Sequence, residues 1–342
     1  MRILIDILHP AHVHFFRNFR ADMLERGHDV LVTARQKDVA VDLLEEYSIP
    51  HQVLSSQRTG TIGLAGELIA RTARVVAAAR RFKADVLTGI MGPAIAPAGK
   101  LLRVPAIVFY DTEFATRTNR FVYPLATAVC TPDCYEGKVH GTHVTYPGYH
   151  ELAYLHPNRF TPDRSRLVAF GLEPGQPYSV VRFVSWEASH DSGEVALTAA
   201  QKRRVVDELS ARGPVVVSSE GPLPDDLADR ALTGPVTDVH HLLAFADVVV
   251  GESATMSSEA AVLGTPAVFI ATTGRGYTGD QERRYGLVRS FTPPEFDRAV
   301  DTATSMAVLS QEDRHKRRAQ LLHDKIDVTA WMVDFFAEHH TQ

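Results

Sequence analysis

One segment of the chain, residues 246–270, limits the possible folds more than any other. It begins as an apolar strand and passes through a turn of small and hydroxyl residues into a helix. Gly264 and Pro266 stop that helix, and a second apolar strand follows. A strand, a helix and a strand in this order form a βαβ unit, in which the two strands are parallel. The segment therefore predicts an α/β fold built on a parallel sheet.

Strand and helix patterns alternate along the rest of the chain in two series. The first series starts with a strand at residues 2–8, and the second starts near residue 165. Residues 156–177, between them, are rich in Pro, Gly and polar residues, as expected of a linker. A chain of 342 residues is long enough for two domains. We predict an N-terminal domain (1–163), a C-terminal domain (164–325) and a C-terminal helix (326–342) that is a candidate to cross back to the first domain.

The composition excludes several classes of protein. Lys and Arg number 36 against 41 Asp and Glu, a net charge of −5, which argues against non-specific nucleic-acid binding. No apolar run approaches the 18 residues of a membrane-spanning helix. Cys130 and Cys134 are too few for a disulfide framework or a zinc site. We therefore expect a cytoplasmic protein that binds no nucleic acid.

The turn at the start of the helix in residues 246–270 predicts a phosphate site. Ser253, Ala254 and Thr255 are small, so the backbone N–H groups at the helix N-terminus are exposed to an anion. Glu259, about a turn and a half into the helix, could reach the sugar next to that phosphate. The alternative is an ordinary capped helix, because Ser253 or Thr255 would serve as an N-cap in any case.

The same segment resembles the nucleotide-sugar loop of the GT-B superfamily, which holds two-domain glycosyltransferases and non-hydrolysing UDP-N-acetylglucosamine 2-epimerases. The epimerase loop reads Asp-Ser-Gly-Gly-x-x-Glu-Glu-Ala-x-x-Leu-Gly-x-Pro. Glu252 stands for the Asp, Ala254 and Thr255 replace the two glycines, and the residues in register are Ser253, Glu259, Ala260, Leu263, Gly264 and Pro266. The resemblance implies two Rossmann-like domains that face a central cleft. It also implies that Ser253 and the backbone after it hold the diphosphate and that Glu259 holds the ribose.

Histidines cluster after the first strand, at His9, His12 and His14. A loop at the carboxyl end of a strand faces the predicted cleft, and histidine can act as a general base near neutral pH. His12 and His14 are therefore candidate catalytic residues, in place of the Gly-Gly-His-type loop of many GT-B transferases. The alternatives are that these histidines cap the helix or bond to backbone. A metal site on His12 and His14 would lack a third ligand, so we predict none.

A patch of acidic residues follows the strand at residues 104–110. Glu113 and Arg117 match the Glu and Arg of the epimerase sequence His-Val-Glu-Ala-Gly-Leu-Arg, in which the Glu is catalytic. Glu113 is therefore a third candidate catalytic residue. The epimerases also need an Asp where residues 89–92 have none, and their His-Arg-Arg-Glu is replaced at residues 182–187. The alternative for this patch is an acidic first helical turn.

Two further loops of the second domain supply candidate donor contacts. Arg182 could neutralise the diphosphate as it leaves, and Trp186 could stack on a base or pack in the core. In the glycine-rich stretch 273–281, Arg275 could supply positive charge. Asp280 and Gln281 match the residues with which GT-B transferases often hold the donor sugar. The alternative for this stretch is a flexible surface loop.

Three stretches together resemble the prokaryotic family known as domain of unknown function 354. They are the His-Val-His-Phe-Phe turn at 12–16, the Tyr-Pro-Gly-Tyr-His-Glu stretch at 146–151 and the string at 182–191. That resemblance extends over essentially the whole chain, and the family is assigned to the GT-B group by similarity.

We therefore predict a metal-independent glycosyltransferase without a tightly bound cofactor. Its substrates would be a nucleotide diphosphate sugar, with the UDP-linked form expected first, and an acceptor glycan or lipid-linked sugar of cell-envelope or polysaccharide biosynthesis. A UDP-N-acetylglucosamine 2-epimerase-like enzyme and a non-catalytic sugar-nucleotide-binding protein are the alternatives. The basic helix with Arg71, Arg74, Arg80 and Arg81 is expected to be a solvated face, and peripheral contact with the inner face of the membrane is left open.

Overall fold

The chain folds into two compact units in a computed structural model that describes residues 1–36, 39–57, 60–113, 116–184 and 195–339. Met1–Tyr154 and Ile326–Gln342 form the first unit, and Leu155–Lys325 forms the second. The first unit ends before residue 163, where the sequence suggested a boundary. The helix at the C-terminus is part of the first unit.

A parallel sheet forms the centre of the first unit. Among the described residues it has seven strands in the order β3-β2-β1-β4-β5-β6-β7. The strands are β1 (Arg2–Ile7), β2 (Asp29–Gln36), β3 (His51–Ser56), β4 (Val86–Ile90), β5 (Ala106–Phe109), β6 (Ala128–Pro132) and β7 (His143–Tyr146). β1, β4, β5 and β6 are almost entirely buried, as expected of parallel strands that are covered on both faces.

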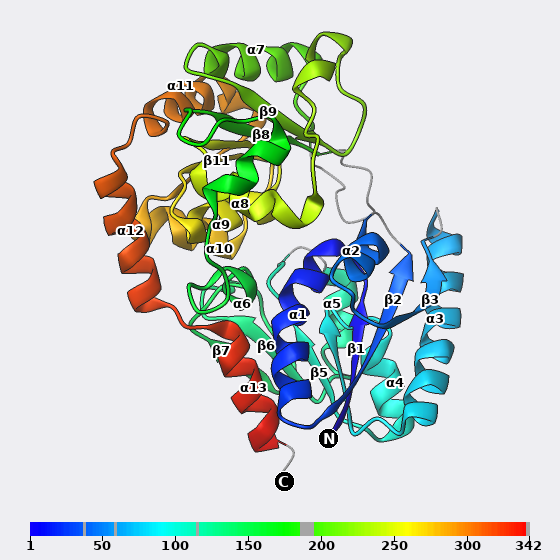
Figure 1. Ribbon diagram of the computed structural model, residues 1–342. Helices are drawn as coiled ribbons and strands as arrows, with labels where there is room; N and C mark the ends of the chain where they lie inside the picture. The colour runs from blue at the N-terminus through cyan, green and yellow to red at the C-terminus, as the bar shows by residue number, and fades with distance from the viewer. Residues whose placement is uncertain (37–38, 58–59, 114–115, 185–194, 340–342) are drawn as a thin grey trace. The chain divides into compact units, whose positions relative to one another are not determined.

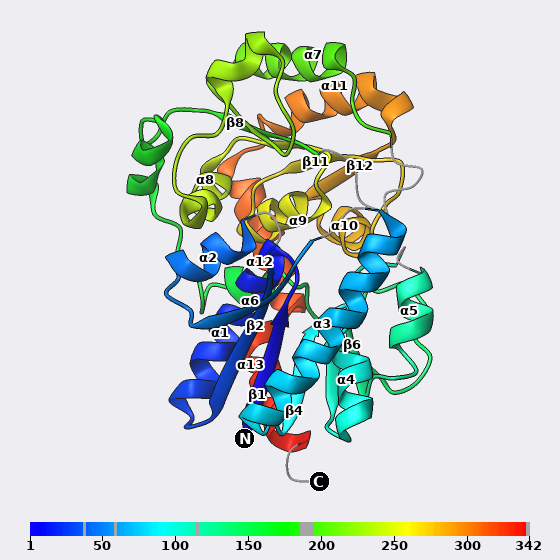
Figure 2. The same cartoon turned by 90° about the vertical axis from the view of Figure 1, so that its right-hand side faces the viewer.

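Helices cover both faces of this sheet (Figures 1 and 2). They are α1 (Pro10–Glu25), α2 (Ala40–Glu46), α3 (Thr61–Phe82), α4 (Ile95–Leu102), α5 (Thr116–Val122), α6 (Leu152–Leu155) and α13 (Val328–His339). α1 and α13 lie on one face, and α3 and α4 lie on the other. The α/β fold expected from the strand and helix patterns is therefore confirmed for this unit.

The last helix, α13, closes the apolar core of the first unit. The ring of Phe336 packs 4.8 Å from that of Phe19 on α1, and Trp331 packs 4.8 Å from Tyr146 on β7. The hydroxyl of Thr329 donates a 2.7 Å hydrogen bond to the carbonyl of Ala153. Because Phe336 and Thr329 of this helix and their partners Phe19 and Ala153 are buried, α13 is an integral part of the core rather than an appended tail.

The second unit is a smaller parallel sheet with helices on both sides. Its described strands have the order β12-β11-β10-β8-β9. They are β8 (Ser179–Phe183), β9 (Val215–Ser219), β10 (Val249–Gly251), β11 (Ala267–Ile270) and β12 (Val288–Phe291). Residues 246–270 supply β10, α9 and β11, and β10 pairs with β11 in parallel as the βαβ pattern predicts.

The helices of the second unit form two layers. α7 and α11 lie on one face of the sheet, and α8, α9 and α10 lie on the other (Figures 1 and 2). The α-helices are α7 (Ala199–Ser210), α8 (Val239–Phe245), α9 (Ala254–Leu263), α10 (Gly276–Asp280), α11 (Phe296–Met306) and α12 (Gln311–Asp324). Shorter helical segments are η1 (Arg164–Phe170), η2 (Asp225–Arg230), η3 (Val236–Asp238), η4 (Gln281–Tyr285) and η5 (Pro293–Glu295).

Each sheet reverses its winding direction at one point, and a glycine marks each point. In the first unit the chain winds outward on both sides of the β1–β4 pair, and in the second on both sides of the β8–β10 pair. A Cβ at Gly89 of β4 would lie 2.9 Å from the carbonyl oxygen of Asp6, and a Cβ at Gly251 of β10 would clash with that of Arg182. Ligands of open α/β sheets bind at the carboxyl ends of the strands beside such a reversal.

Candidate functional site

The candidate residues lie at the carboxyl edges of the two sheets, and we describe each edge separately. In the first unit the edge holds the start of α1 after β1, and the residues after β5 and β7. In the second unit it holds the start of α9 after β10, together with the ends of β8 and β9.

The histidines after β1 lie at the start of a helix, which corrects the expectation that they form a loop. α1 begins at Pro10, because proline suits the first helical position and the His9 side chain accepts a hydrogen bond from the backbone N–H of Ala11. His12 and His14 are thus helical and largely buried. The Nδ1 atom of His12 accepts a 3.3 Å hydrogen bond from the backbone N–H of Leu8. When neutral, His12 therefore carries its proton on Nε2.

His14 packs between two tyrosines. Its ring stacks 5.3 Å from that of Tyr154 and meets the ring of Tyr47 edge-on at 5.9 Å. The residue is 7% exposed. These contacts give His14 a packing role at the junction of α1, α2 and α6.

A carboxylate–histidine pair lies at the carboxyl edge of the first sheet. Asp111 follows β5, and its Oδ2 lies 3.0 Å from Nδ1 of His150. The hydroxyl of Thr112 donates a 3.0 Å hydrogen bond to the other carboxylate oxygen of Asp111. The His150 ring lies 4.5 Å from that of Phe15, which is one turn after His12 on α1. The edge thus gathers His12, Asp111 and His150.

The environment of Asp111 favours its ionised form. Burial acts to raise the pKa of this carboxyl group, but the charge of His150 and the hydrogen bonds from His150 and Thr112 outweigh it. The charge of His12 acts in the same direction, so the pKa of Asp111 lies below its ordinary value. An ionised Asp111 keeps a proton on Nδ1 of His150.

Glu113 lies two residues after Asp111 and is half-buried. Its Oε1 accepts a 3.3 Å hydrogen bond from the backbone N–H of Glu136. The side chain of Arg117, the second match to the epimerase sequence, lies outside the described part of the structure, as does the whole of Trp186.

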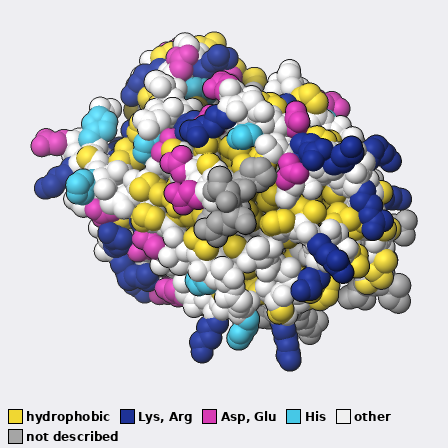
Figure 3. Space-filling view, turned by 90° about the horizontal axis from the view of Figure 1, so that it is seen from below, with side chains coloured by type: hydrophobic (Ala, Val, Ile, Leu, Met, Phe, Trp, Pro, Cys, Tyr) yellow, Lys and Arg dark blue, Asp and Glu magenta, His cyan; other side chains and the backbone are white. Residues whose placement is uncertain are grey.

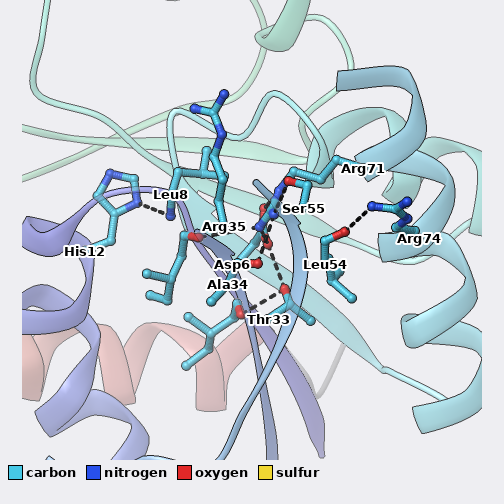
Figure 4. A network of polar contacts seen from close by, with 12 residues as sticks. Asp6, Leu8, His12, Thr33, Ala34, Arg35, Leu54, Ser55, Arg71 and Arg74 are labelled. Carbon is cyan, nitrogen blue, oxygen red and sulfur yellow. Dashed lines mark hydrogen bonds and ion pairs between the residues drawn. The ribbon is translucent and has the colours of Figure 1, made fainter. Parts of the chain in front are cut away.

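A buried ion pair braces the end of β1 (Figure 4). Arg71 of α3 pairs with Asp6, and both side chains are 3% exposed. Nη1 of Arg71 also donates hydrogen bonds to the carbonyl of Ala34 at 3.1 Å and to the hydroxyl of Ser55 at 3.0 Å. The hydroxyl of Thr33 donates a 2.6 Å hydrogen bond to Asp6. The pair therefore ties α3 to β1, β2 and β3.

Arg71 corrects the expectation of a uniformly solvated basic helix. It lies on the apolar face of α3, one turn before the buried Val75, and its charge is satisfied inside the unit. Arg74, Arg80 and Arg81 are exposed as expected. Lys and Arg side chains gather toward the right of Figure 3, on the side where α3 lies in Figure 1, with hydrophobic side chains among them. No helix within the described ranges has both the length and the apolar character needed to cross a bilayer.

In the second unit, Ser253 caps α9 with its side chain. Its hydroxyl accepts a 3.2 Å hydrogen bond from the backbone N–H of Met256, and Gly264 ends the helix in the left-handed conformation. Ser253, Ala254 and Thr255 are half-buried. Glu252, just before the cap, instead accepts backbone hydrogen bonds from Val184 at 3.1 Å and Leu197 at 2.7 Å. The end of β10 thus presents a capped helix N-terminus at the sheet reversal.

Glu259 is buried on α9 and bonded to a histidine. Nε2 of His240, on α8, lies 3.0 Å from Oε1 of Glu259. The two side chains are 3% and 9% exposed. Because a carboxylate only accepts hydrogen bonds, Nε2 of His240 is the donor, and it fixes the orientation of the Glu259 carboxylate.

The two candidate arginines already have partners. Arg182, at the end of β8, donates a 2.7 Å hydrogen bond to Ser218 of β9 and a 2.6 Å hydrogen bond to Glu220, just after that strand. Nη1 of Arg275 donates to the carbonyl and hydroxyl of Thr273 at 3.1 Å and 2.9 Å. A phosphate group would have to replace Glu220 beside Arg182.

Residues 276–285 are helical, not the loop that the glycines suggested, and this changes the surroundings of two candidates. Asp280 closes α10, and its carboxylate lies 3.3 Å from Nζ of the buried Lys325. Gln281 is fully buried, and its amide donates a 2.7 Å hydrogen bond to Ser258 of α9. The Gln281 side chain is therefore enclosed against α9.

Several site residues were not identified from the sequence. Asp6 interrupts an apolar strand and Arg71 interrupts the apolar face of a helix, and each is a signal of a buried partner. His150 and His240 carry no such signal, because their partners lie 39 and 19 residues away. Within the described residues no group of three or more His, Cys, Asp or Glu side chains is placed to hold a metal ion.

Solved structures of two kinds of enzyme share this fold. The UDP-GlcNAc 2-epimerase from Neisseria meningitidis bound to UDP-GlcNAc is 11% identical with a TM-score of 0.72, over 99% of this chain and 100% of that one. The glycosyltransferase VinC in complex with dTDP is 12% identical with a TM-score of 0.63, and MurG from Acinetobacter baumannii is 15% identical with a TM-score of 0.57. Both comparisons cover 99% of this chain and 100% of the other.

The likeness at this level of identity shows the fold, which is the GT-B fold expected from the sequence. No curated protein matches the sequence. A match to a family model confirms the family resemblance for the first part of the chain. Residues 1–151 match the family described as "Protein of unknown function (DUF354)", and the whole chain has the fold of GT-B glycosyltransferases and UDP-GlcNAc 2-epimerases.

Proposed function

We propose that this protein is a glycosyltransferase that uses a nucleotide diphosphate sugar as donor and binds it on the second unit. The observation that carries the proposal is the start of α9. Ser253 caps a ten-residue helix at the sheet reversal, and the same helix carries the buried carboxylate of Glu259. Backbone N–H groups and the helix dipole attract an anion at this point. The solved structures with the same fold include complexes with UDP-GlcNAc and dTDP, which supports this choice of ligand.

The candidates at α9 and at the end of β8 then have specific roles. The diphosphate lies at Ser253 and the backbone of Ala254 and Thr255, and Glu259 accepts hydrogen bonds from the ribose hydroxyls. His240 keeps the Glu259 carboxylate in one orientation through its 3.0 Å bond. Arg182 supplies positive charge by exchanging Glu220 for phosphate.

The first unit supplies the residues that act on the acceptor, and the acceptor is a glycan or a lipid-linked sugar. A UDP-linked donor is our first choice. The reaction uses no tightly bound cofactor in this proposal, because the leaving diphosphate can be stabilised by the helix N-terminus and arginine.

A thermal-shift screen tests donor binding. We expect one of UDP, dTDP and their sugar conjugates to raise the melting temperature, because a ligand that binds only the folded state adds about 2.7 kcal/mol at one hundred times its Kd. Glu259→Ala should weaken the affinity for that nucleotide about 10- to 100-fold, the loss expected for a charged hydrogen bond of about 1.5–3 kcal/mol.

Glu208→Ala is the matched control, because Glu208 is an exposed carboxylate of the same unit on α7. It should leave the affinity unchanged. If no nucleotide stabilises the wild-type protein, or if both variants bind equally well, the second unit is not a nucleotide-sugar site.

Epimerisation is the second candidate function. The observation in its favour is the TM-score of 0.72 with the Neisseria meningitidis epimerase, against 0.63 and 0.57 for VinC and MurG. Product analysis separates the two reactions. A transferase releases the nucleoside diphosphate and a glycosylated acceptor, whereas an epimerase returns a nucleotide sugar of changed configuration.

A further inference from the structure

We propose that Nε2 of His150 is the general base of the transfer reaction and that Asp111 is the residue that positions its ring. This inference rests on the proposed function and assigns the base to a residue outside the histidine cluster after β1. It depends on three features of the first unit: the protonation of each ring, the surroundings of His150 Nε2, and the packing of the other candidates.

The bond to Asp111 gives His150 the tautomer that a base needs. Nδ1 of His150 donates to Oδ2 of Asp111 over 3.0 Å, so the lone pair of the neutral ring is on Nε2. His12 has the opposite arrangement, because its Nδ1 accepts from the backbone N–H of Leu8. A neutral His12 therefore presents an N–H at Nε2, which can donate to an oxygen but cannot accept a proton from it.

The Nε2 atom of His150 also indicates a place where a substrate could bind. It is buried and has no hydrogen-bond partner among the described residues. The whole side chain is 8% exposed. A buried polar atom without a partner costs about 1–3 kcal/mol, so such atoms are normally satisfied by water or by a ligand. A substrate hydroxyl that donates to Nε2 would remove this cost and would be placed for proton transfer.

The other candidates are engaged in different ways. His14 packs between Tyr47 and Tyr154 and lies on the second turn of α1. The Glu113 carboxylate accepts a hydrogen bond from the backbone of Glu136. The Asp111–His150 pair differs from both in one respect: its carboxylate fixes which ring nitrogen of the histidine accepts a proton.

The proton transfer follows from this arrangement. The acceptor hydroxyl oxygen forms a bond to the anomeric carbon of the donor sugar while its proton moves to Nε2 of His150. The bond between that carbon and the diphosphate oxygen breaks, and its electron pair leaves with the nucleoside diphosphate. The resulting imidazolium is stabilised by the ionised Asp111.

His150→Asn tests the base without removing the bond to Asp111. An asparagine amide takes the place of Nδ1 and can still donate to the carboxylate, but it has no atom at the place of Nε2. We expect release of nucleoside diphosphate from the donor to slow about 10²- to 10⁴-fold, the usual contribution of a general base. The affinity for the nucleotide should not change. The acid limb of the pH–rate profile, where the base becomes protonated, should disappear.

Two further variants complete the comparison. Asp111→Asn should lower kcat and change the pH–rate profile without a change in nucleotide affinity, because it removes the carboxylate that fixes the tautomer. His140→Asn replaces an exposed histidine of the same unit and should behave as the wild type. Far-UV circular dichroism and the melting temperature show whether each variant is folded.

A measurement on the wild-type protein does not depend on any variant or on turnover. In a sample with ¹⁵N-labelled histidine, the neutral His150 ring should show a protonated Nδ1 and an unprotonated Nε2. The opposite tautomer would overturn the proposal. So would a His150→Asn protein that binds the donor and turns it over at the wild-type rate. Absence of nucleotide binding by the wild type would instead contradict the proposed function itself, so the two failures are distinguishable.

Discussion

Each unit of the protein holds a buried histidine bonded to a carboxylate, and the two pairs use different ring nitrogens. In the first unit Nδ1 of His150 bonds to Asp111, and in the second Nε2 of His240 bonds to Glu259, both over 3.0 Å. The choice of nitrogen decides what the ring can do. A neutral histidine that donates to a carboxylate through Nδ1 keeps its lone pair on Nε2, which can then accept a proton. A histidine that donates through Nε2 uses that nitrogen to orient the carboxylate.

In the proposed reaction, this difference gives proton transfer to the first unit and nucleotide binding to the second. The two sheets are otherwise alike at the points where their winding direction reverses. At each point a glycine, Gly89 or Gly251, allows the backbone of the neighbouring strand to approach more closely than a Cβ would permit. Similar scaffolds thus present a proton acceptor on one unit and a fixed acceptor of hydrogen bonds on the other. Three predictions test how separate these tasks are.

The largest effect, on the free energy of unfolding, is expected for the buried Asp6–Arg71 ion pair of the first unit. Asp6→Asn leaves the charge of Arg71 buried without its partner, which should lower the free energy of unfolding by about 3–5 kcal/mol. Urea denaturation measures this change. Nucleotide affinity of the folded variant should remain that of the wild type, because Asp6 belongs to the other unit.

The matched control is Asp85→Asn, which breaks the partly exposed pair of Asp85 with Arg2 in the same sheet. Its cost should be about 1 kcal/mol or less. Equal costs for the two variants, or weaker nucleotide binding by folded Asp6→Asn protein, would contradict the separation of tasks.

A smaller effect is expected at His240, where the choice of amide is informative. A glutamine at position 240 places its amide nitrogen close to where Nε2 of the histidine was, so it can still donate to Glu259. An asparagine places its amide nitrogen where Nδ1 was. We expect His240→Asn to weaken nucleotide affinity about tenfold, equal to about 1.4 kcal/mol, and His240→Gln to preserve it. Calorimetric titration of the nucleotide measures both. If the asparagine variant binds as well as the glutamine variant, His240 does not position Glu259.

The smallest effect concerns pH and Asp111. Its pKa is lowered because the charge of His150 and the hydrogen bonds to the carboxylate outweigh burial. The ionised group therefore stabilises the fold above about pH 4, the ordinary range of an aspartate, and this stabilisation is lost as the pH falls through the lower folded-state pKa. The difference in free energy of unfolding between wild type and Asp111→Asn should shrink on acidification.

Urea denaturation at a series of pH values measures that difference. Asp42→Asn, at an exposed aspartate of α2, is the control and should show little change over the same range. A difference between wild type and Asp111→Asn that grows toward acid pH would show that Asp111 is not held in its ionised form.

The fold could be predicted from the sequence because its signals are local. Ser253 and Gly264 bracket α9, and apolar runs on both sides of it mark β10 and β11. The start of α1 was predicted wrongly because Pro10 was not recognised as a first helical residue. The histidine–carboxylate pairs could not be predicted, since Asp111 and His150 meet only when β5 and β7 join the same sheet.

The membership of α13 in the first unit has a consequence for biosynthesis. Residues 326–339 leave the ribosome only after the whole of the second unit has been made. Until then the nascent first unit lacks the helix that covers Phe19 and Tyr146. The second unit, which is continuous in sequence, is complete earlier. The half of the protein that is translated first is therefore the half that finishes folding last.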